Sequence, residues 1–310
     1  MTTTEKVLRA ADRVQQGHPG LAFAVAVWKK FGDDQAGNLA ALLAYYTFIA
    51  IFPLLLVLIT VLDIVASHDA ALRQRVLSSA LRAYPVIGPQ LQGSVHSPHQ
   101  TGVALVIGLL GSLLGARGVA GAAQNAFNAV WEVPLDRRPA FPWSTIRGIS
   151  LVLVVGVGEI VTVTLSGLVT GHLIAGVAGQ VGTIALSLVL NVGLFWLAFR
   201  LATASEVSWR DLRLGAVLSA VAWQVLQLLG GYVIRRLLEH SSALYGVFGV
   251  VLGLLAWLYL QAQITLYAVE ASTVHAWHLW PRSLRPPPLT DQDRHAYRLY
   301  SRVERRPPAG

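Results

Sequence analysis

One carboxylate lies in the middle of a long apolar stretch of this 310-residue chain. Glu159 stands about ten residues into the stretch 148–169, which places it roughly 15 Å along a helix and close to the midplane of a bilayer. A charged side chain there costs about 3 kcal/mol on insertion scales, so it normally faces the protein interior and has a partner or a function. Glu159 is therefore the first candidate for a substrate or proton site.

Three amides lie at a similar depth in two other apolar stretches. Asn191 belongs to the stretch 181–201, and Gln224 and Gln227 belong to 212–233. Together with the carboxylate they would form a polar layer that lines a cavity for a headgroup, an ion or a proton. The same side chains could instead hydrogen-bond one another as packing contacts, each worth about 0.6 kcal/mol between membrane helices. The sequence leaves both interpretations open.

A second carboxylate and an arginine lie where two apolar stretches reach the predicted inner face of the membrane. Glu270 follows the last apolar stretch, and Arg117 follows a glycine-rich run; both are further candidates for the substrate or proton site. The guanidinium of Arg117 can reach lipid phosphates at little cost or bind a specific anion. Pairing of Glu270 with Arg117 or Arg147 would offset the desolvation of the carboxylate, and is the contact that we expect.

Small residues at regular spacing predict close contacts between helices. Glycines three or four positions apart share one side of a helix, and their small size lets a neighbouring backbone approach. A proline inside an apolar stretch removes one backbone donor and predicts a kink. The candidate packing residues are Gly111, Gly115, Gly246, Gly249, Gly253 and Pro53.

The residue patterns of hydrolytic and redox enzymes are missing. The chain has no cysteine, which excludes disulfides and thiolate metal sites. The histidines are scattered singly, apart from His275 and His278 at one membrane end. Metal-dependent nucleases need clustered His and Asp side chains to hold ions and activate water. We therefore expect no enzymatic activity, no metal and no cofactor.

The elements that position these residues are predicted by hydropathy. Hydrophobic residues make up 54% of the chain and charged residues 13%, against the roughly 25% charged residues of a soluble domain. A membrane-spanning helix needs about 20 apolar residues, and six stretches meet that length. We therefore predict an all-α polytopic membrane protein with six spans. The spans are about 38–62, 102–123, 148–169, 181–201, 212–233 and 244–267.

Three regions follow from this pattern. Residues 1–35 are predicted to form amphipathic helices at the inner membrane interface, because Val7, Ala11 and Val14 recur at helical spacing among basic residues. Residues 36–270 form the six-helix transmembrane domain. Residues 271–310 are rich in Arg and Pro, and we expect a flexible cytoplasmic tail.

The distribution of basic residues predicts the orientation. Of the 24 Lys and Arg residues, nineteen lie in the two terminal regions and in the connections after spans two and four, and five lie on the other side. By the positive-inside rule, both termini are cytoplasmic and the long connection 67–100 is outside. Basic residues beside an inner membrane face attract anionic lipid at about 1 kcal/mol each, so we expect lipid headgroups as partners rather than nucleic acid.

Two stretches carry a family resemblance. Residues 39–54 (LAALLAYYTFIAIFPL) resemble the first span of the YihY/BrkB family of bacterial inner-membrane proteins. Residues 242–249 (SALYGVFG), continuing to Glu270, resemble its last span, and 126–133 (AFNAVWEV) is a supporting match. The resemblance implies a six-span protein of the bacterial inner membrane that is associated with envelope integrity. It implies no defined reaction, and the ribonuclease label once attached to the family has no support in these residues.

Three classes of function remain open at this stage. The first is transport or handling of a lipid or small anionic molecule through the polar layer at Glu159. The second is a non-transporting scaffold that packs by its glycines and forms a homo-oligomer. The third, a membrane-embedded enzyme, lacks a nucleophile–base or metal pair. A cavity that reaches Glu159 would favour the first class, and a Glu159 capped by Asn or Gln would favour the second.

Overall fold

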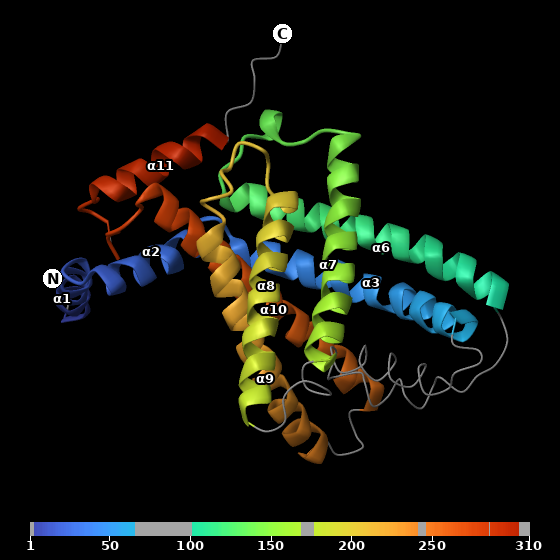
Figure 1. Ribbon diagram of the computed structural model, residues 1–310. Helices are drawn as coiled ribbons and strands as arrows, with labels where there is room; N and C mark the ends of the chain where they lie inside the picture. Colours follow the sequence, from blue (N-terminus) through green and yellow to red (C-terminus); the bar gives the residue numbers. More distant parts are fainter. Residues whose placement is uncertain (1–2, 66–100, 169–176, 241–245, 285, 304–310) are drawn as a thin grey trace, which may run out of the picture.

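The computed structural model describes residues 3–65, 101–168, 177–240, 246–284 and 286–303, and all regular structure in these ranges is helical (Figure 1). The predicted all-α class is therefore confirmed for these ranges, while the connection 67–100, which we predict to be outside, is not among the described residues. The helices are α1 (Thr3–Gln16), α2 (Pro19–Asp33), α3 (Ala36–Val65), α6 (Thr101–Val130), α7 (Trp143–Leu168), α8 (Val177–Ala202), α9 (Arg213–His240), α10 (Gly246–Trp277) and α11 (Asp291–Val303), with a single 3-10 turn at Leu135–Arg137.

Five helices in the described ranges are long and apolar enough to cross a membrane. Their candidate spans are Ala36–Leu54, Val106–Val130, Trp143–Thr162, Val181–Ala202 and Val251–Trp277, in α3, α6, α7, α8 and α10. The stretch predicted as the fifth of six spans is also helical, as α9, and is 28 residues long. Its described part is not among these candidates, so the sixth span stays a prediction.

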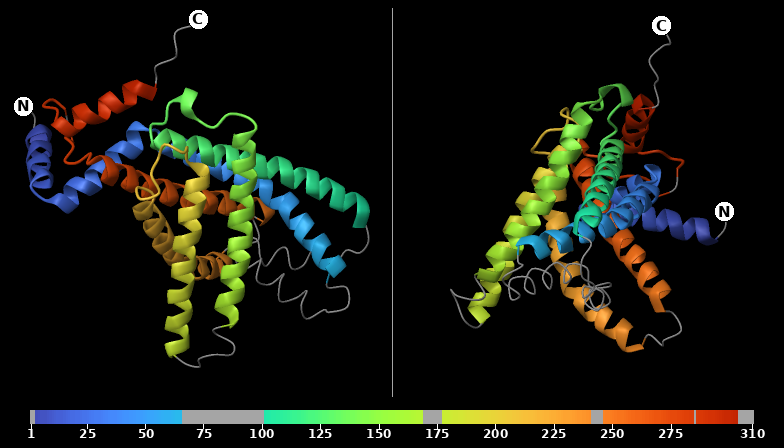
Figure 2. Two further views of the ribbon diagram at one scale, coloured as in Figure 1. Left: turned by 45° about the horizontal axis from the view of Figure 1, so that its top comes forward. Right: turned by 90° about the vertical axis from the view of Figure 1, so that its right-hand side faces the viewer.

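The long helices form three antiparallel pairs, α3 with α6, α7 with α8, and α9 with α10 (Figure 2). The pairs come together at one end of the molecule, which we call the packed end, and diverge from it in different directions. The core residues Ala36, Val130, Ala202, Leu212 and Val269 show that one end of each pair contributes to it. Elsewhere along the helices many large apolar side chains are exposed, as expected for surfaces that face lipid.

Aromatic and small residues fill the packed end together. Phe127 on α6 contacts Phe199 on α8, with ring centroids 4.8 Å apart, and Phe31 on α2 stacks on Tyr267 of α10 at 3.8 Å. Such ring pairs add to the free energy gained from apolar burial. The packed end therefore holds the main buried core, and α2 and α11 pack together in a second core beside it.

Residues 291–303 are helical, so the prediction of a flexible tail was wrong for this part of the chain. These residues form α11, whose Ala296 packs with Ala26 of α2 and Val274 of α10 in a second core. Thr290 caps the helix: its hydroxyl accepts a hydrogen bond from the backbone N–H of Asp293 at 3.0 Å, and its own N–H donates to the Asp293 carboxylate at 3.2 Å. This reciprocal capping starts a helix despite the preceding prolines.

The N-terminal region consists of two helices separated at His18, with Pro19 in the first turn of α2. α1 and α2 lie within residues 1–35, and the amphipathic, interfacial character predicted for this region stays a prediction. One face of α2 packs inside the protein, where Ala22, Ala26 and Lys30 are buried.

Candidate functional site

A fully buried lysine occupies the centre of the packed end. Lys30, on α2, has no exposed side-chain surface. Its Nζ donates to the backbone carbonyl of Val130 at 2.9 Å and to Oε1 of Glu132 at 3.2 Å, and it also bonds the carboxylate of Asp34 one helical turn further on. The ring of Tyr300 on α11 lies 5.6 Å from Nζ. The lysine therefore joins α2, the chain after α6, and α11.

Glu270 completes this group from α10. Its carboxylate is fully buried, and Oε2 lies 3.4 Å from Nζ of Lys30. Neither carboxylate oxygen has a hydrogen-bond partner among the described residues. Glu270 thus pairs with Lys30 instead of the expected Arg117 or Arg147. We call Lys30, Asp34, Glu132 and Glu270 the Lys30 cluster.

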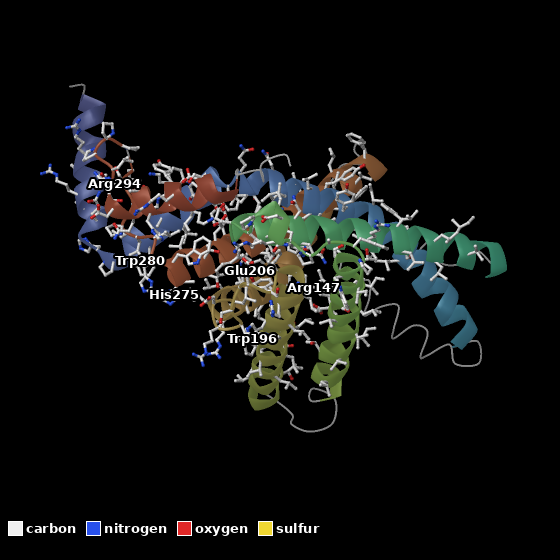
Figure 3. All side chains as sticks on the ribbon, turned by 90° about the horizontal axis from the view of Figure 1, so that it is seen from above. Arg147, Trp196, Glu206, His275, Trp280 and Arg294 are labelled. Atoms are coloured by element: carbon white, nitrogen blue, oxygen red, sulfur yellow. The ribbon has the colours of Figure 1, made fainter. Side chains whose placement is uncertain are left out.

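The two arginines have other surroundings. Arg117 on α6 is exposed, which is compatible with the predicted reach toward lipid phosphates. Arg147 on α7 donates to the backbone carbonyl of Arg200 at 2.8 Å and to that of Thr203 (Figure 3). These carbonyls belong to the C-terminal end of α8, where a cation interacts favourably with the helix dipole. Arg147 therefore holds α7 to α8.

The backbone of Glu132 is left-handed, and this conformation directs its side chain toward Lys30. Glu132 has φ 47° directly after α6, and the N–H of Val133 donates to the carbonyl of Asn128 at 2.9 Å. A non-glycine residue in this conformation costs about 1–2 kcal/mol, so it persists only where surrounding contacts hold it. The Oδ1 of Asn128 accepts the N–H of Ala204 at 2.8 Å, which fixes the same turn to the chain after α8.

A second ion network adjoins the Lys30 cluster and secures α11. Arg282 is fully buried and bonds Asp293 and Asp33 at 2.9 Å each. Lys29 reaches the same Asp293 carboxylate at 2.9 Å. The hydroxyl of Tyr300 accepts from Arg282 at 3.3 Å and donates to Asp33 at 3.4 Å, which links the two groups.

Burial and neighbouring charges shift the pKa values of this end in different directions. Burial lowers the pKa of Lys30, but the surrounding carboxylates outweigh it and raise the pKa above its usual range. Burial raises the pKa of Glu132 to about 7, against the opposing effect of Lys30. The pKa of Asp293 lies below its usual range, because hydrogen bonds from Lys29, Ser283 and Arg282 outweigh its burial. Lys30 therefore stays charged, whereas Glu132 titrates near neutral pH.

The four predicted mid-membrane residues are not joined to one another by any hydrogen bond or ion pair in the described ranges. Glu159 is half-buried on α7, and its carboxylate has no such partner there. Asn191 is buried on α8 with its Oδ1 unpaired among the described residues. Gln224 and Gln227 are half-buried on α9. The amide cap of Glu159 that would indicate a purely structural role is therefore not seen in this part of the chain.

Among the predicted packing residues, those on α6 lie against α3. A Cβ added at Gly115 would come within 2.8 Å of Ala50, and one at Gly111 within 3.0 Å of Pro53. Pro53 lies inside α3 without ending it. On α10, Gly249 and Gly253 are half-buried, and Gly246 is the first residue of the helix.

The histidine pair near the end of α10 forms a stack of rings. His275 and His278 both stack on Trp280, with ring centroids 5.9 and 5.4 Å apart, and Figure 3 shows His275 and Trp280 side by side. The described residues contain no group of three or more His, Cys, Asp or Glu side chains suited to a metal ion.

Sequence reasoning missed Lys30, Asp34 and Glu132 as site residues. Lys30 follows the short apolar run 21–28. The available signal was its spacing, because Ala22, Ala26 and Lys30 recur every four residues and so share one face of a helix. For α11 the missed signal was the capping pattern at Thr290 and Asp293.

Comparison with known proteins settles the family. The model of the family described as virulence factor BrkB matches residues 27–288, which include Lys30, Glu132 and Glu270. The chain belongs to this family. The resemblance drawn from residues 39–54 and 242–249 is thereby confirmed.

The relatives of this BrkB-family chain are membrane proteins by name. It is 25% identical over 278 residues to a UPF0761 membrane protein of Pseudomonas paraeruginosa, covering 87% of this chain and 67% of that one. A UPF0761 membrane protein of Stenotrophomonas maltophilia is 26% identical, covering 90% of this chain and 66% of the relative. The inner membrane protein YhjD of Escherichia coli is 25% identical, covering 85% and 83%. The chain thus spans about two thirds of the UPF0761 relatives, and no solved structure matches it.

Proposed function

We propose that this BrkB-family chain is a multi-pass protein of the bacterial inner membrane that supports envelope integrity by transporting or handling a lipid or small anionic molecule at the level of Glu159. The observation that carries the proposal is the half-buried Glu159 carboxylate, which lies on an apolar helix without a hydrogen-bond or ion-pair partner among the described residues. Ionisable residues at such depth are costly, and they typically mark substrate or proton pathways.

The distribution of packing supports a moving structure. The cores of buried residues gather at the packed end, and the helix pairs diverge beyond it. Transporters work by rocking rigid helix groups against one another around a central site. In this chain the pairs α3–α6, α7–α8 and α9–α10 would be those groups, with Glu159 and the buried Asn191 on one of them.

Arginine–tryptophan contacts at the packed end support binding of anionic lipid. The guanidinium of Arg200 lies 5.5 Å from the ring of Trp209, and that of Arg213 lies 5.5 Å from the ring of Trp196. Neither arginine forms an ion pair with a carboxylate in the described ranges. Tryptophan prefers the membrane interface, and unpaired arginines there attract lipid phosphates. We therefore propose that this end, with both termini, lies at the cytoplasmic leaflet.

The decisive experiment replaces the carboxylate by its amide. Glu159→Gln preserves shape and removes the charge, so the variant should insert and fold normally yet fail to complement a deletion of the gene in an envelope-stress assay. Glu206→Gln is the matched control, because Glu206 is an exposed carboxylate whose ion pair within the described ranges is with the exposed Arg137. Full complementation by Glu159→Gln would contradict a transport role.

An oligomeric scaffold is the second candidate, and the tight glycine contacts favour it. Besides Gly115, a Cβ at Gly118 would come within 2.6 Å of Tyr46, so α3 and α6 pack as closely as a rigid scaffold requires. A scaffold predicts that Glu159→Gln is silent and that cross-linking yields one constant oligomer.

We further propose that the chain is not an enzyme and needs no cofactor. A ribonuclease would have to place metal ligands or an acid–base pair around its substrate. Purified protein incubated with RNA and Mg²⁺ or Mn²⁺ should leave the RNA intact. Cleavage that is lost on mutation of a residue of this chain would refute this.

A further inference from the structure

The Lys30 cluster contains more negative than positive side chains. One ammonium, that of Lys30, faces three carboxylates, those of Asp34, Glu132 and Glu270. All four side chains are buried, with exposed fractions of 0, 5, 9 and 0%. If every carboxyl were ionised, the group would hold two uncompensated negative charges away from water. Buried charges without partners are strongly disfavoured, so such a group retains protons.

The other charged groups nearby do not remove this excess. On the chain after α6, Arg138 is near Glu132 but directs its hydrogen bonds to the carbonyl of Val133 at 3.1 Å and to Asn125 at 2.9 Å. On α11, Tyr300 contributes a neutral ring and a hydroxyl that bonds Asp33. Arg282, on the other side of Tyr300, forms its ion pairs with Asp33 and Asp293.

Glu270 supplies an independent observation. It is fully buried on α10, and no described residue hydrogen-bonds either of its carboxylate oxygens. Because the Lys30 ammonium at 3.4 Å is shared with two other carboxylates, an ionised Glu270 costs far more free energy here than a protonated one. The Lys30 cluster is thus a place where the chain itself lacks a positive charge.

We propose that the Lys30 cluster is a proton-binding site, in which the carboxyl group of Glu132 takes up a proton from the adjacent solvent and releases it again. Of the four side chains Glu132 is the most accessible, so it is the entry point, and the fully buried Glu270 keeps its proton. This site goes beyond the proposed function and does not depend on transport at Glu159.

Proton uptake at Glu132 has a structural consequence. An ionised Glu132 holds the turn after α6 to Lys30 through the 3.2 Å ion pair, and a protonated one does not. Lys30 then remains paired with Asp34, and these two charges balance because Glu270 already carries its proton. The site therefore couples the proton concentration on this side of the membrane to the contact between α2 and the α6–α7 connection. The pKa of Glu132 near 7 agrees with exchange around neutral pH.

Infrared difference spectroscopy of the purified full-length protein in lipid nanodiscs tests the site. Spectra at ~pH 5.5 and ~pH 8.5, on either side of the pKa near 7, should differ by a carboxyl C=O stretching band that appears at low pH. Glu132→Gln should abolish that band, and the exposed control Glu206→Gln should leave it unchanged. A band that persists in Glu132→Gln, or that is missing from the wild type, would overturn the proposal.

A second measurement uses only the wild type, so its result does not depend on whether Glu132→Gln folds. Glutamate labelled with ¹³C at the side-chain carboxyl should shift the band to lower frequency, whereas labelled aspartate should not. A shift with aspartate alone would assign the titration to another residue and contradict the role of Glu132. Neither outcome bears on Glu159→Gln complementation, so this proposal and the proposed function can fail separately.

Discussion

At the scale of single residues, the Lys30 cluster makes the stability of the protein depend on pH in an unusual direction. Most paired carboxylates have a lowered pKa and stabilise the folded state as pH rises, but burial raises the pKa of Glu132 to about 7. Between the ordinary carboxyl pKa of 4.5 and this value, the folded state binds more protons than the unfolded state. The contribution of Glu132 to stability is therefore present at low pH and is lost as pH rises toward neutrality.

Glu132→Gln should remove this pH dependence. The amide cannot ionise, so above ~pH 7 the variant should unfold at a higher temperature than the wild type, by about 2–4 °C for each kcal/mol regained. The difference should vanish below ~pH 4.5, where Glu132 is protonated in both the folded and the unfolded state. Thermal melts in detergent across this range measure it. A variant that is less stable than the wild type at every pH would contradict the sign.

Lys30→Met should be among the most damaging substitutions in the chain. It leaves three buried carboxyls without their cation, and breaking a buried ion pair from one side costs about 3–5 kcal/mol. Adding Asp34→Asn should recover part of that loss, because it removes a buried negative charge that Lys30 no longer neutralises. Unfolding in denaturant compares the single and the double variant. An additive effect of the two substitutions would show that Lys30 and Asp34 are not coupled.

At the scale of elements, α11 and α2 illustrate how charged side chains close the packed end. α11 is short and strongly polar, and a helix of 13 residues is marginal alone in water. It is held by the Asp293 carboxylate, which accepts hydrogen bonds from Lys29 of α2 and from Arg282 and the N–H of Ser283. Together with the apolar contact of Ala296, these bonds decide that the helix forms.

Asp293→Asn should undock α11. The substitution removes the charge that two cations share and weakens the cap at Thr290, so amide hydrogens of 291–303 should exchange much faster. Asp291→Asn is the matched control, because Asp291 lies in the same first turn with 90% of its side chain exposed. Hydrogen–deuterium exchange followed by mass spectrometry measures the exchange rates in both variants. Equal protection in the two variants would contradict the role of Asp293.

At the scale of the whole molecule, the helix directions place the two described termini together. α2 and α11 are joined by the 2.9 Å ion pair of Lys29 with Asp293, so the segments that precede and follow the long helices share one end. The basic residues Arg147, Arg200 and Arg213 lie at this same end. This arrangement is the one that an even number of spans requires.

The orientation can be tested because the natural chain has no cysteine. A single cysteine introduced at Ala80, in the connection predicted to be outside, should react with a membrane-impermeant maleimide added to intact cells stripped of their outer membrane. A cysteine at exposed Glu206 should react only after the inner membrane is opened. The reverse pattern would place both termini outside and contradict the positive-inside argument.

The helical fold, the membrane class and the family were all predictable from the sequence alone. Runs of about 20 apolar residues can satisfy their backbone groups in lipid only as helices, and this holds whatever surrounds them. The motifs at 39–54 and 242–249 were sufficient to predict the family, because each is a local pattern that can be read without the tertiary structure. Local spacing also predicted the close packing at Gly111 and Gly115.

Only the tertiary structure decided which charges meet. Lys30 and Glu132 are 102 residues apart, and Lys30 and Glu270 are farther apart still, so no periodicity connects them. Their approach depends on how α2, α6 and α10 converge, which is determined by the packing of residues such as Phe31 on Tyr267. Because of this convergence, Glu270 pairs with Lys30 instead of the expected arginine. It also allows residues 291–303 to pack as α11, where a flexible tail was expected. No local segment contains both partners of such a contact. Which charges meet is therefore decided by how all the helices pack at this end.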